Sequence, residues 1–346
     1  MNRNEQRWLV GLSLSELESV AAEAGLRPFA ARQMADWLYR KRTADLAAMT
    51  NLSLAARQRL AGAGYVVGRI EPCEVQVSRD GTKKYLFPTL GGGYIEAVYI
   101  PDRDRATLCV SSQAGCKMGC RFCMTGRQGF QHQLTAGEIV NQVLAIPEAE
   151  RLTNVVFMGM GEPMDNIGAV LRAVEILTAE WGLGWSPTRI TVSTVGIVPA
   201  MERLLRETKV HIAVSLHNPF DGERRELMPV QNKYPIEEVA AVLRRFDFAH
   251  QRRLSFEYIV FEGMNDSPRH VEGLVRLLRG LECRINLIRF HAIPDSPLRG
   301  VSPERMHRLN GALNAAGITT TTRASRGEDI FAACGLLSTA AKNRSV

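Results

Sequence analysis

The chain has 346 residues, of which 45% are hydrophobic and 23% charged, and its formal net charge is +7. This length allows one large domain and a smaller one, with the composition of an ordinary soluble protein. No apolar stretch approaches the 18 residues of a membrane span, and the N-terminus lacks the apolar core of a signal peptide. We therefore expect a cytoplasmic protein whose positive charge permits nucleic-acid binding.

The first part of the chain has the pattern of short helices. Ser13 and Glu16 have the spacing of a capping box at the start of a helix. Met34 and Trp37 follow at helical spacing and are typical of the buried face of a second helix, and a third helix follows. We predict a small helical domain over residues 1–68, which we interpret as an RNA-binding accessory domain.

Residues 69–101 change to the alternating pattern of β-strands. The residues from Val75 to Phe87 predict a β-hairpin around a turn at Asp80-Gly81, and a further strand is expected over 94–100. We interpret this segment as a β connector between the helical domain and the rest of the chain.

From residue 106 onward, expected strands alternate with helices. The expected strands are 106–111, 154–158, 189–193, 211–215, 254–260 and 284–290. Such alternation predicts a parallel sheet with right-handed crossovers. Because six strand–helix units fall short of a complete eight-stranded barrel, we predict an α/β fold with a partial (β/α)6 barrel over residues 102–336.

Three cysteines lie within eight residues, directly after the first expected barrel strand: Cys116, Cys120 and Cys123. Thiolates are soft ligands that favour iron–sulfur clusters and zinc. Three ligands leave one position open, as a reactive centre requires and a closed structural zinc site avoids. The run resembles the radical S-adenosylmethionine (SAM) signature, in which three cysteines hold one [4Fe–4S] cluster and the fourth iron binds SAM. The structural alternative is a zinc knuckle completed by Cys109 or a distant residue.

Polar side chains also follow later strands, where the active site of a β/α barrel is built. Glu162 lies in Gly159-Met160-Gly161-Glu162-Pro163 and resembles the motif that contacts the SAM amino group. The other polar residues at expected strand ends are Ser193, Ser215, His217 and His291.

Four cysteines lie outside the cluster motif. Cys109 is on the first barrel strand, and Cys334 is near the C-terminus. In a cytosolic chain, cysteines indicate metal binding or catalysis before structural disulfides. Most free cysteines are nevertheless buried and inert, and this is our interpretation of Cys73 and Cys283.

Longer motifs around these residues resemble the RlmN family. They are 108–116, 123–130, 158–163, 215–218 and 332–335. The resemblance runs over nearly the whole chain, including the helical N-terminal part. It implies a radical SAM fold and a methyltransferase that acts on C2 of an adenine in the peptidyl-transferase centre of 23S rRNA. It also implies action on the adenine 3′ of the anticodon in tRNAs, with one [4Fe–4S] cluster per chain and two SAM molecules per turnover.

The resemblance further implies roles for individual residues. Cys334 takes a methyl group from one SAM, and this group later joins C2 as a protein–RNA crosslink. Cys109 attacks the Cys334 sulfur, forms a disulfide and releases the methylated RNA. Glu96 matches the proposed general base of the family, although the residue pattern alone predicts an exposed side chain on an edge strand. The implied SAM contacts are Gly161, Glu162, Ser193, Ser215, Leu216, His217 and His291, the last in place of the usual asparagine.

An RNA substrate requires a basic surface and a base turned out of its stack. The arginines expected near the active face are Arg127, Arg224, Arg225 and Arg326. The resemblance also implies a flavodoxin-type electron donor and a monomeric protein, with no membrane partner.

Three alternatives stay open. A sister enzyme methylates C8 of the same ribosomal adenine and confers antibiotic resistance, although Pro163 and residues 128–130 favour the C2 enzyme. A radical SAM enzyme acting on a small molecule is the second. The third is a non-catalytic, metal-stabilised RNA-binding protein, in which Cys109 and Cys334 have no role.

Overall fold

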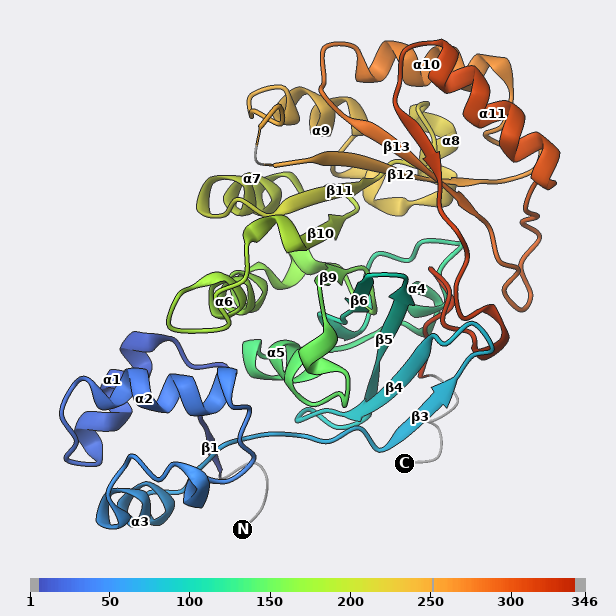
Figure 1. Ribbon diagram of the computed structural model, residues 1–346. Coiled ribbons are helices and arrows are strands. Elements are labelled where there is room, and N and C mark those ends of the chain that lie inside the picture. Colours follow the sequence, from blue (N-terminus) through green and yellow to red (C-terminus); the bar gives the residue numbers. More distant parts are fainter. Residues whose placement is uncertain (1–5, 251, 340–346) are drawn as a thin grey trace.

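The computed structural model describes residues 6–250 and 252–339, and it begins with a helical unit (Figure 1). The elements of this unit are β1 (Arg7–Trp8), α1 (Leu14–Glu23), α2 (Ala30–Ala35), the π-helical turn η2 (Asp36–Arg40), the 3-10 turn η3 (Leu46–Ala48), α3 (Leu54–Gly62) and β2 (Tyr65–Val66). The strands β1 and β2 pair in parallel and bring the two ends of the unit together.

The predicted helix start at Ser13 is confirmed. The Ser13 hydroxyl accepts the Glu16 N–H at 3.2 Å, and the Glu16 carboxylate accepts the Ser13 N–H at 2.7 Å, so two unpaired donors of the first turn are satisfied. The second predicted helix is α2 followed by the π turn, in which the Lys41 N–H donates to the Asp36 carbonyl five residues earlier.

A twisted sheet forms the centre of the molecule. In the order of their neighbours its strands are β14 (Thr320–Thr322), β13 (Arg284–Arg289), β12 (Leu254–Val260), β11 (His211–Ser215), β10 (Ile190–Thr194), β9 (Asn154–Phe157), β6 (Arg105–Cys109), β5 (Tyr94–Asp102), β4 (Lys83–Pro88) and β3 (Glu74–Val77). From β6 to β14 neighbouring strands run parallel, whereas β5, β4 and β3 continue the sheet in antiparallel fashion. The six predicted barrel strands are confirmed within one or two residues, and β14 is an additional short one.

Helices follow the parallel strands and cover the outside of the sheet (Figure 1). They are α5 (Ala136–Leu144), α6 (Ile167–Thr178), α7 (Val198–Glu207), α8 (Asp221–Leu227), α9 (Ile236–Leu243), α10 (Pro268–Leu278) and α11 (Pro303–Ala315). Shorter turns are η4 (Ala149–Arg151), η5 (Pro163–Asn166), η6 (Pro187–Arg189) and η7 (Pro229–Asn232). This arrangement confirms the predicted partial barrel. Among the described residues, none of these helices has both the length and the apolar character needed to cross a bilayer.

The cysteine loop begins and ends in a small hairpin that the sequence did not predict. Its strands are β7 (Gln113–Gly115) and β8 (Phe130–Gln133), and the helix α4 (Met124–Gln128) lies between them. Gly115 has φ +73°, and a Cβ there would approach the Gly129 carbonyl oxygen to 1.8 Å. Only glycine permits this close crossing of the two ends of the loop.

After β14 the chain returns along the antiparallel edge of the sheet and past α4 (Figure 1). This C-terminal segment contains the turn η8 (Glu328–Ile330) and is otherwise irregular. The Gly327 N–H donates to Asp80 Oδ2 at 3.0 Å, and the Met124 N–H donates to the Gly335 carbonyl at 2.8 Å. These bonds hold the segment on both sides of Cys334.

Candidate active site

A cavity opens at the carboxyl ends of the parallel strands, which is the functional end of a β/α barrel. Most of the predicted site residues line it: Cys116, Cys120, Cys123, Gly161, Glu162, Ser193, Ser215, His217 and Cys334. The structure therefore brings together residues from four strand ends and the C-terminal segment. Cys109, Glu96, Leu216 and His291 lie outside this lining.

The three cysteines of the motif line one side of the cavity as free thiols. Burial raises the pKa of Cys116 to about 12 and also raises the pKa of Cys120 and of Cys123. A bound metal favours deprotonation of such buried thiols, and the three thiols of the motif are soft donors that line the same cavity.

Those three thiols do not converge on a single point. Within residues 6–250 and 252–339, no group of three His, Cys, Asp or Glu side chains is compact enough to hold one metal ion. In an iron–sulfur cluster each thiolate binds a different iron, so separated sulfur atoms suit a cluster. The donor set thus fits a [4Fe–4S] cluster with one iron left for another ligand.

Glu162 is buried at the end of β9, and its carboxylate is held by three donors. They are the Thr194 hydroxyl at 2.7 Å, the Val195 N–H at 3.0 Å and the Met164 N–H at 3.0 Å. Burial outweighs these hydrogen bonds and raises the pKa of Glu162 to about 7. A carboxylate in such a place gains a counter-charge when a ligand ammonium group binds.

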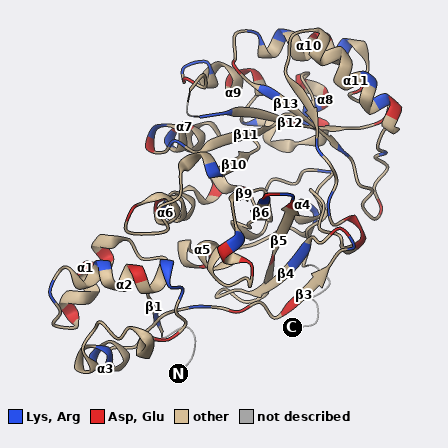
Figure 2. Ribbon diagram, viewed as in Figure 1, with Lys and Arg blue, Asp and Glu red and all other residues tan. Residues whose placement is uncertain are grey.

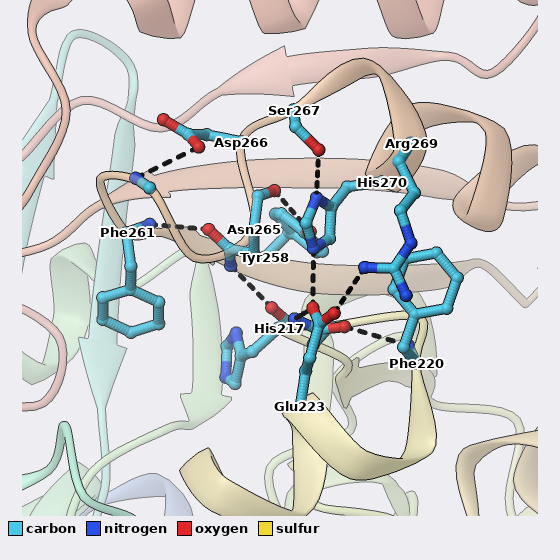
Figure 3. Close-up of polar contacts among 12 residues, drawn as sticks. His217, Phe220, Glu223, Tyr258, Phe261, Asn265, Asp266, Ser267, Arg269 and His270 are labelled. Atoms are coloured by element: carbon cyan, nitrogen blue, oxygen red, sulfur yellow. Dashed lines mark hydrogen bonds and ion pairs between the residues drawn. The ribbon is translucent and has the colours of Figure 1, made fainter.

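His217 is held in a single orientation at the end of β11 (Figure 3). Its Nδ1 accepts the Ile259 N–H at 3.0 Å, so the proton of the neutral ring is on Nε2. Burial lowers the pKa of His217 to about 3, which keeps the ring neutral. The backbone has φ +55°, and Phe122 of the cysteine loop packs edge-on against the ring at 4.7 Å between centroids.

Asn265 holds the backbone of His217 through a hydrogen bond (Figure 3). Its Nδ2 donates to the His217 carbonyl at 2.6 Å and to the Ile259 carbonyl at 2.7 Å, and its Oδ1 accepts the Phe261 N–H at 2.7 Å. The side chain is fully buried. One amide thus fixes the ends of β11 and β12 relative to each other.

A second polar cluster joins α8 to α10 beside Asn265 (Figure 3). His270 contacts Ser267 and Glu223, each at 2.7 Å, and Arg269 forms an ion pair with Glu223 at 2.5 Å. Burial alone would raise the pKa of Glu223, but the hydrogen bonds from Arg269, His270 and Asn218 outweigh it and lower the pKa to about 2. These residues are absent from the cavity lining, and they stabilise the packing of the two helices.

Cys334 lines the cavity, and Cys109 lies near enough for the charges of the two side chains to interact. Cys109 is buried at the end of β6, whereas Cys334 is exposed. Burial raises the pKa of Cys109 to about 12, and the nearby Cys334 thiol adds to this effect. Both cysteines are free thiols, so the disulfide that the family resemblance implies as a reaction step is not formed in this structure.

Arg323 completes this part of the site, and no motif in the sequence predicted it. Its Nη1 lies 3.3 Å from Glu257 Oε2 and 3.4 Å from Met158 Sδ, and Arg323 and Glu257 line the cavity with Cys334. The negative charge of a Cys334 thiolate, followed by that of Glu257, raises the pKa of Arg323. A positive charge therefore faces both thiols. Glu257 was detectable as the one charged residue inside the apolar β12 run.

The prediction from the residue pattern that Glu96 is an exposed edge-strand residue is wrong. Glu96 is 6% exposed, because β5 lies between β4 and β6 and the C-terminal segment covers it. Its carboxylate accepts the Ser338 N–H at 3.0 Å and pairs with Lys84 at 3.0 Å. Burial raises the pKa of Glu96, and Lys84 opposes this rise.

Two implied SAM contacts lie away from the cavity surface. Leu216 is fully buried in the apolar core, and its N–H donates to the Glu257 carbonyl at 3.0 Å. The His291 ring contacts the Ser325 hydroxyl at 3.0 Å and lies 3.7 Å from Glu328. A SAM contact at His291 therefore stays a prediction.

Charged side chains of both signs are distributed over the helical unit and the barrel (Figure 2). Of the four arginines predicted to face RNA, Arg127 and Arg225 are exposed and Arg326 is partly exposed. The prediction for Arg224 is wrong, because its side chain is fully buried beneath the strand ends.

Comparison with known proteins gives matches over both parts of the chain. The model of the Radical SAM superfamily matches residues 110–278, and that of the ribosomal RNA large subunit methyltransferase N-terminal domain matches residues 8–66.

Individual proteins match over nearly the full length. The chain is 53% identical to a probable dual-specificity RNA methyltransferase RlmN of Parabacteroides distasonis, over 97% of this chain and 98% of the relative. It is 43% identical to the dual-specificity RNA methyltransferase RlmN of Syntrophus aciditrophicus, over 94% and 95%. A crystal structure of a radical SAM methyltransferase from Sphaerobacter thermophilus is 45% identical, covers 96% of this chain and 99% of its own, and superposes with a TM-score of 0.90.

Proposed function

This chain belongs to the RlmN family of radical SAM methyltransferases, and we propose that it methylates C2 of an adenine in 23S rRNA and C2 of the adenine 3′ of the anticodon in tRNAs. The observation that carries the proposal is a fourth cysteine, Cys334, in the cavity lined by the three cysteines of the motif, with Cys109 near enough for the charges of the two to interact. A structural metal site has no use for that second pair.

In this proposal, different side chains have different roles. Cys116, Cys120 and Cys123 hold the cluster, which when bound supplies the electron that cleaves SAM to a reactive radical. Glu162 receives the SAM ammonium group, and the fixed Nε2–H of His217 donates to an oxygen of the same ligand. The polar strand ends at Ser193 and Ser215 complete the binding site.

Cys334 carries the methyl group on its sulfur and presents it to the base. Its place on an irregular, exposed segment at the cavity edge suits a group that must meet both SAM and RNA. The Cys109 thiolate then forms a sulfur–sulfur bond to Cys334 while the bond between the Cys334 sulfur and the transferred carbon breaks. The departing carbon keeps the electron pair of that bond and takes up a proton, so it becomes the methyl group of the product. Arg323 stabilises the thiolate that this attack requires.

Glu96 removes the proton from C2 before the crosslink is resolved. A buried carboxylate with a raised pKa is the kind of group that acts as a base near neutral pH. Glu96 accepts a hydrogen bond from the N–H of Ser338, which lies four residues after Cys334. The C-terminal segment therefore carries the methyl carrier and also holds the side chain of the base.

The electron donor, the oligomeric state and the location are part of the same proposal. We propose a flavodoxin-type donor, a monomer, and a cytoplasmic location where both RNA substrates occur.

The test is an anaerobic assay of the reconstituted chain with SAM, a reductant and either 23S rRNA or tRNA, read by mass spectrometry of the nucleosides. We expect 2-methyladenosine from the wild type and none from Cys334→Ala. Cys283→Ala, which changes a partly buried cysteine outside the cavity lining, serves as the matched control and should keep activity. Formation of 8-methyladenosine would assign the chain to the C8 enzymes, and equal activity of Cys334→Ala would refute the proposed role.

A further inference from the structure

A buried arginine lies beneath the cysteine loop. Arg224 in α8 is fully buried, and it donates four hydrogen bonds within the described residues. They reach the Leu216 carbonyl at 3.0 Å, the Ser215 carbonyl at 2.9 Å, the Val195 carbonyl at 3.0 Å and Gln231 Oε1 at 2.5 Å. All four acceptors are uncharged oxygen atoms, so the geometry satisfies the donors without neutralising the charge.

The cysteine loop is attached to the same helix. The Arg121 N–H donates to the carbonyl of Leu227, the last residue of α8, at 3.0 Å. Val195 and Ser215, whose carbonyls Arg224 binds, line the cavity together with Cys120. Burial lowers the pKa of Arg224 to about 10, and a negative charge on Cys120 would oppose this effect more strongly than Glu237 or Asp221 does.

A buried charge without an ionic partner is costly, and such charges in proteins are usually paired or near a metal site. When the cluster binds, the strong negative charge that this site gains is that of the cluster and its three thiolates. Each electron that reduces the cluster adds one more negative charge. Attraction between opposite charges is large where water is excluded.

We infer that Arg224 is a positioning residue for the redox chemistry of the cluster: its uncompensated positive charge favours the reduced state and raises the reduction potential. This inference rests on the proposed function only in taking the three cysteines as ligands of a cluster. Arg224 also ties the ends of β10 and β11 together, so charge and structure must be separated by experiment.

The charge can be neutralised while the arginine stays in place. Gln231 Oε1 accepts from Arg224, and Gln231 Nε2 donates to Asp221 Oδ1 at 2.6 Å. The double variant Asp221→Asn/Gln231→Glu removes the carboxylate at position 221 and introduces one at position 231, next to the Arg224 guanidinium. The side chains at positions 221 and 231 can still form a hydrogen bond with each other. The net charge of the chain is unchanged.

The potential of the cluster is measured by redox titration of the anaerobically reconstituted full chain, following the electron paramagnetic resonance signal of the reduced cluster. At the wild-type midpoint, we expect the ratio of reduced to oxidised cluster to fall at least tenfold in Arg224→Gln, a shift of about 59 mV to more negative values for one electron. The double variant should shift in the same direction.

Arg252 offers a matched control. It is 5% exposed and donates to the Leu205 carbonyl at 2.7 Å, but it precedes β12 and lies at the end of the strands opposite the cavity. Arg252→Gln should leave the midpoint unchanged. If Arg224→Gln does not fold or does not load a cluster, the double variant decides.

An unchanged midpoint in the double variant, or an equal shift in Arg252→Gln, would overturn the inference. These outcomes are independent of RNA methylation: an active enzyme with an unshifted potential refutes only the role of Arg224. A wild-type chain with a cluster of normal potential and no methylated product refutes only the substrate. A wild-type chain that takes up no cluster would overturn both.

Discussion

Replacement of Asn265 by alanine should be among the most destabilising changes outside the apolar core. The fully buried amide satisfies the His217 and Ile259 carbonyls and the Phe261 N–H (Figure 3). Each buried polar group left without a partner costs about 1–3 kcal/mol, so three of them cost at least about 3 kcal/mol. We expect Asn265→Asp to be at least as harmful, because a carboxylate oxygen would then face two carbonyl oxygens.

Asn314 supplies the control for this prediction. Its side chain makes four hydrogen bonds, three from Nδ2 at 2.9, 3.0 and 3.1 Å and one to Oδ1 at 3.1 Å, but it is exposed on α11. Water can replace these bonds, so Asn314→Ala should cost less than about 1 kcal/mol. The assay is urea unfolding followed by circular dichroism, with SAM binding as a second readout. Equal shifts of the unfolding midpoint for the two alanine variants would refute the reasoning.

Three further changes test other parts of the structure. Gly115→Ala should destabilise the chain by about 3 kcal/mol or more and reduce cluster loading. Gly222→Ala should be neutral or stabilising by up to about 1 kcal/mol, because the added carbon lies in a helix with no atom within 4 Å. Thermal unfolding and the iron content of the two variants test this difference. Glu223→Gln should lower stability at neutral pH by about 1 kcal/mol, since the carboxylate is a third exposed and screened. Because the folded-state pKa of Glu223 is depressed to about 2, its contribution is present above the unfolded value of 4.5, and the difference between the two proteins should vanish as pH falls toward 2 in acid titrations of unfolding. Lys84→Met removes the cation that opposes the raised pKa of Glu96, so the acidic limb of the methylation rate should move to higher pH if this carboxylate is the base, and an unmoved limb would argue against that role.

Helix starts and buried strands were predictable, because interactions between residues close in sequence determine them. Ser13 starts a helix with a complete capping box, and β11 and β12 have the predicted bounds, because caps and buried strands leave a pattern in neighbouring residues. The short strands β7, β8 and β14 leave no such pattern, since three or four residues cannot show a period.

The positions of single polar side chains were harder to predict. Glu96 is buried because Ser338, 242 residues later in the chain, covers it, and no pattern near Glu96 records that contact. Arg224 looks like an exposed helix residue in sequence, yet it is drawn inward by strand-end carbonyls from two other elements. Such burial is set by long-range packing, whereas the cysteine spacing is a local requirement of ligand geometry and is visible in the sequence.

The hydrogen bonds of the C-terminal segment have a consequence for the order of assembly. The Thr125 hydroxyl donates to the Leu337 carbonyl at 2.6 Å, and this pair is 212 residues apart. Contacts of such separation form slowly, and chains fold from the N-terminus as they are synthesised. We therefore expect the strands up to β13 and the cysteine loop to form before the C-terminal segment packs against them. On this order, Cys334, the residue proposed to carry the methyl group, joins a site whose other walls have already formed.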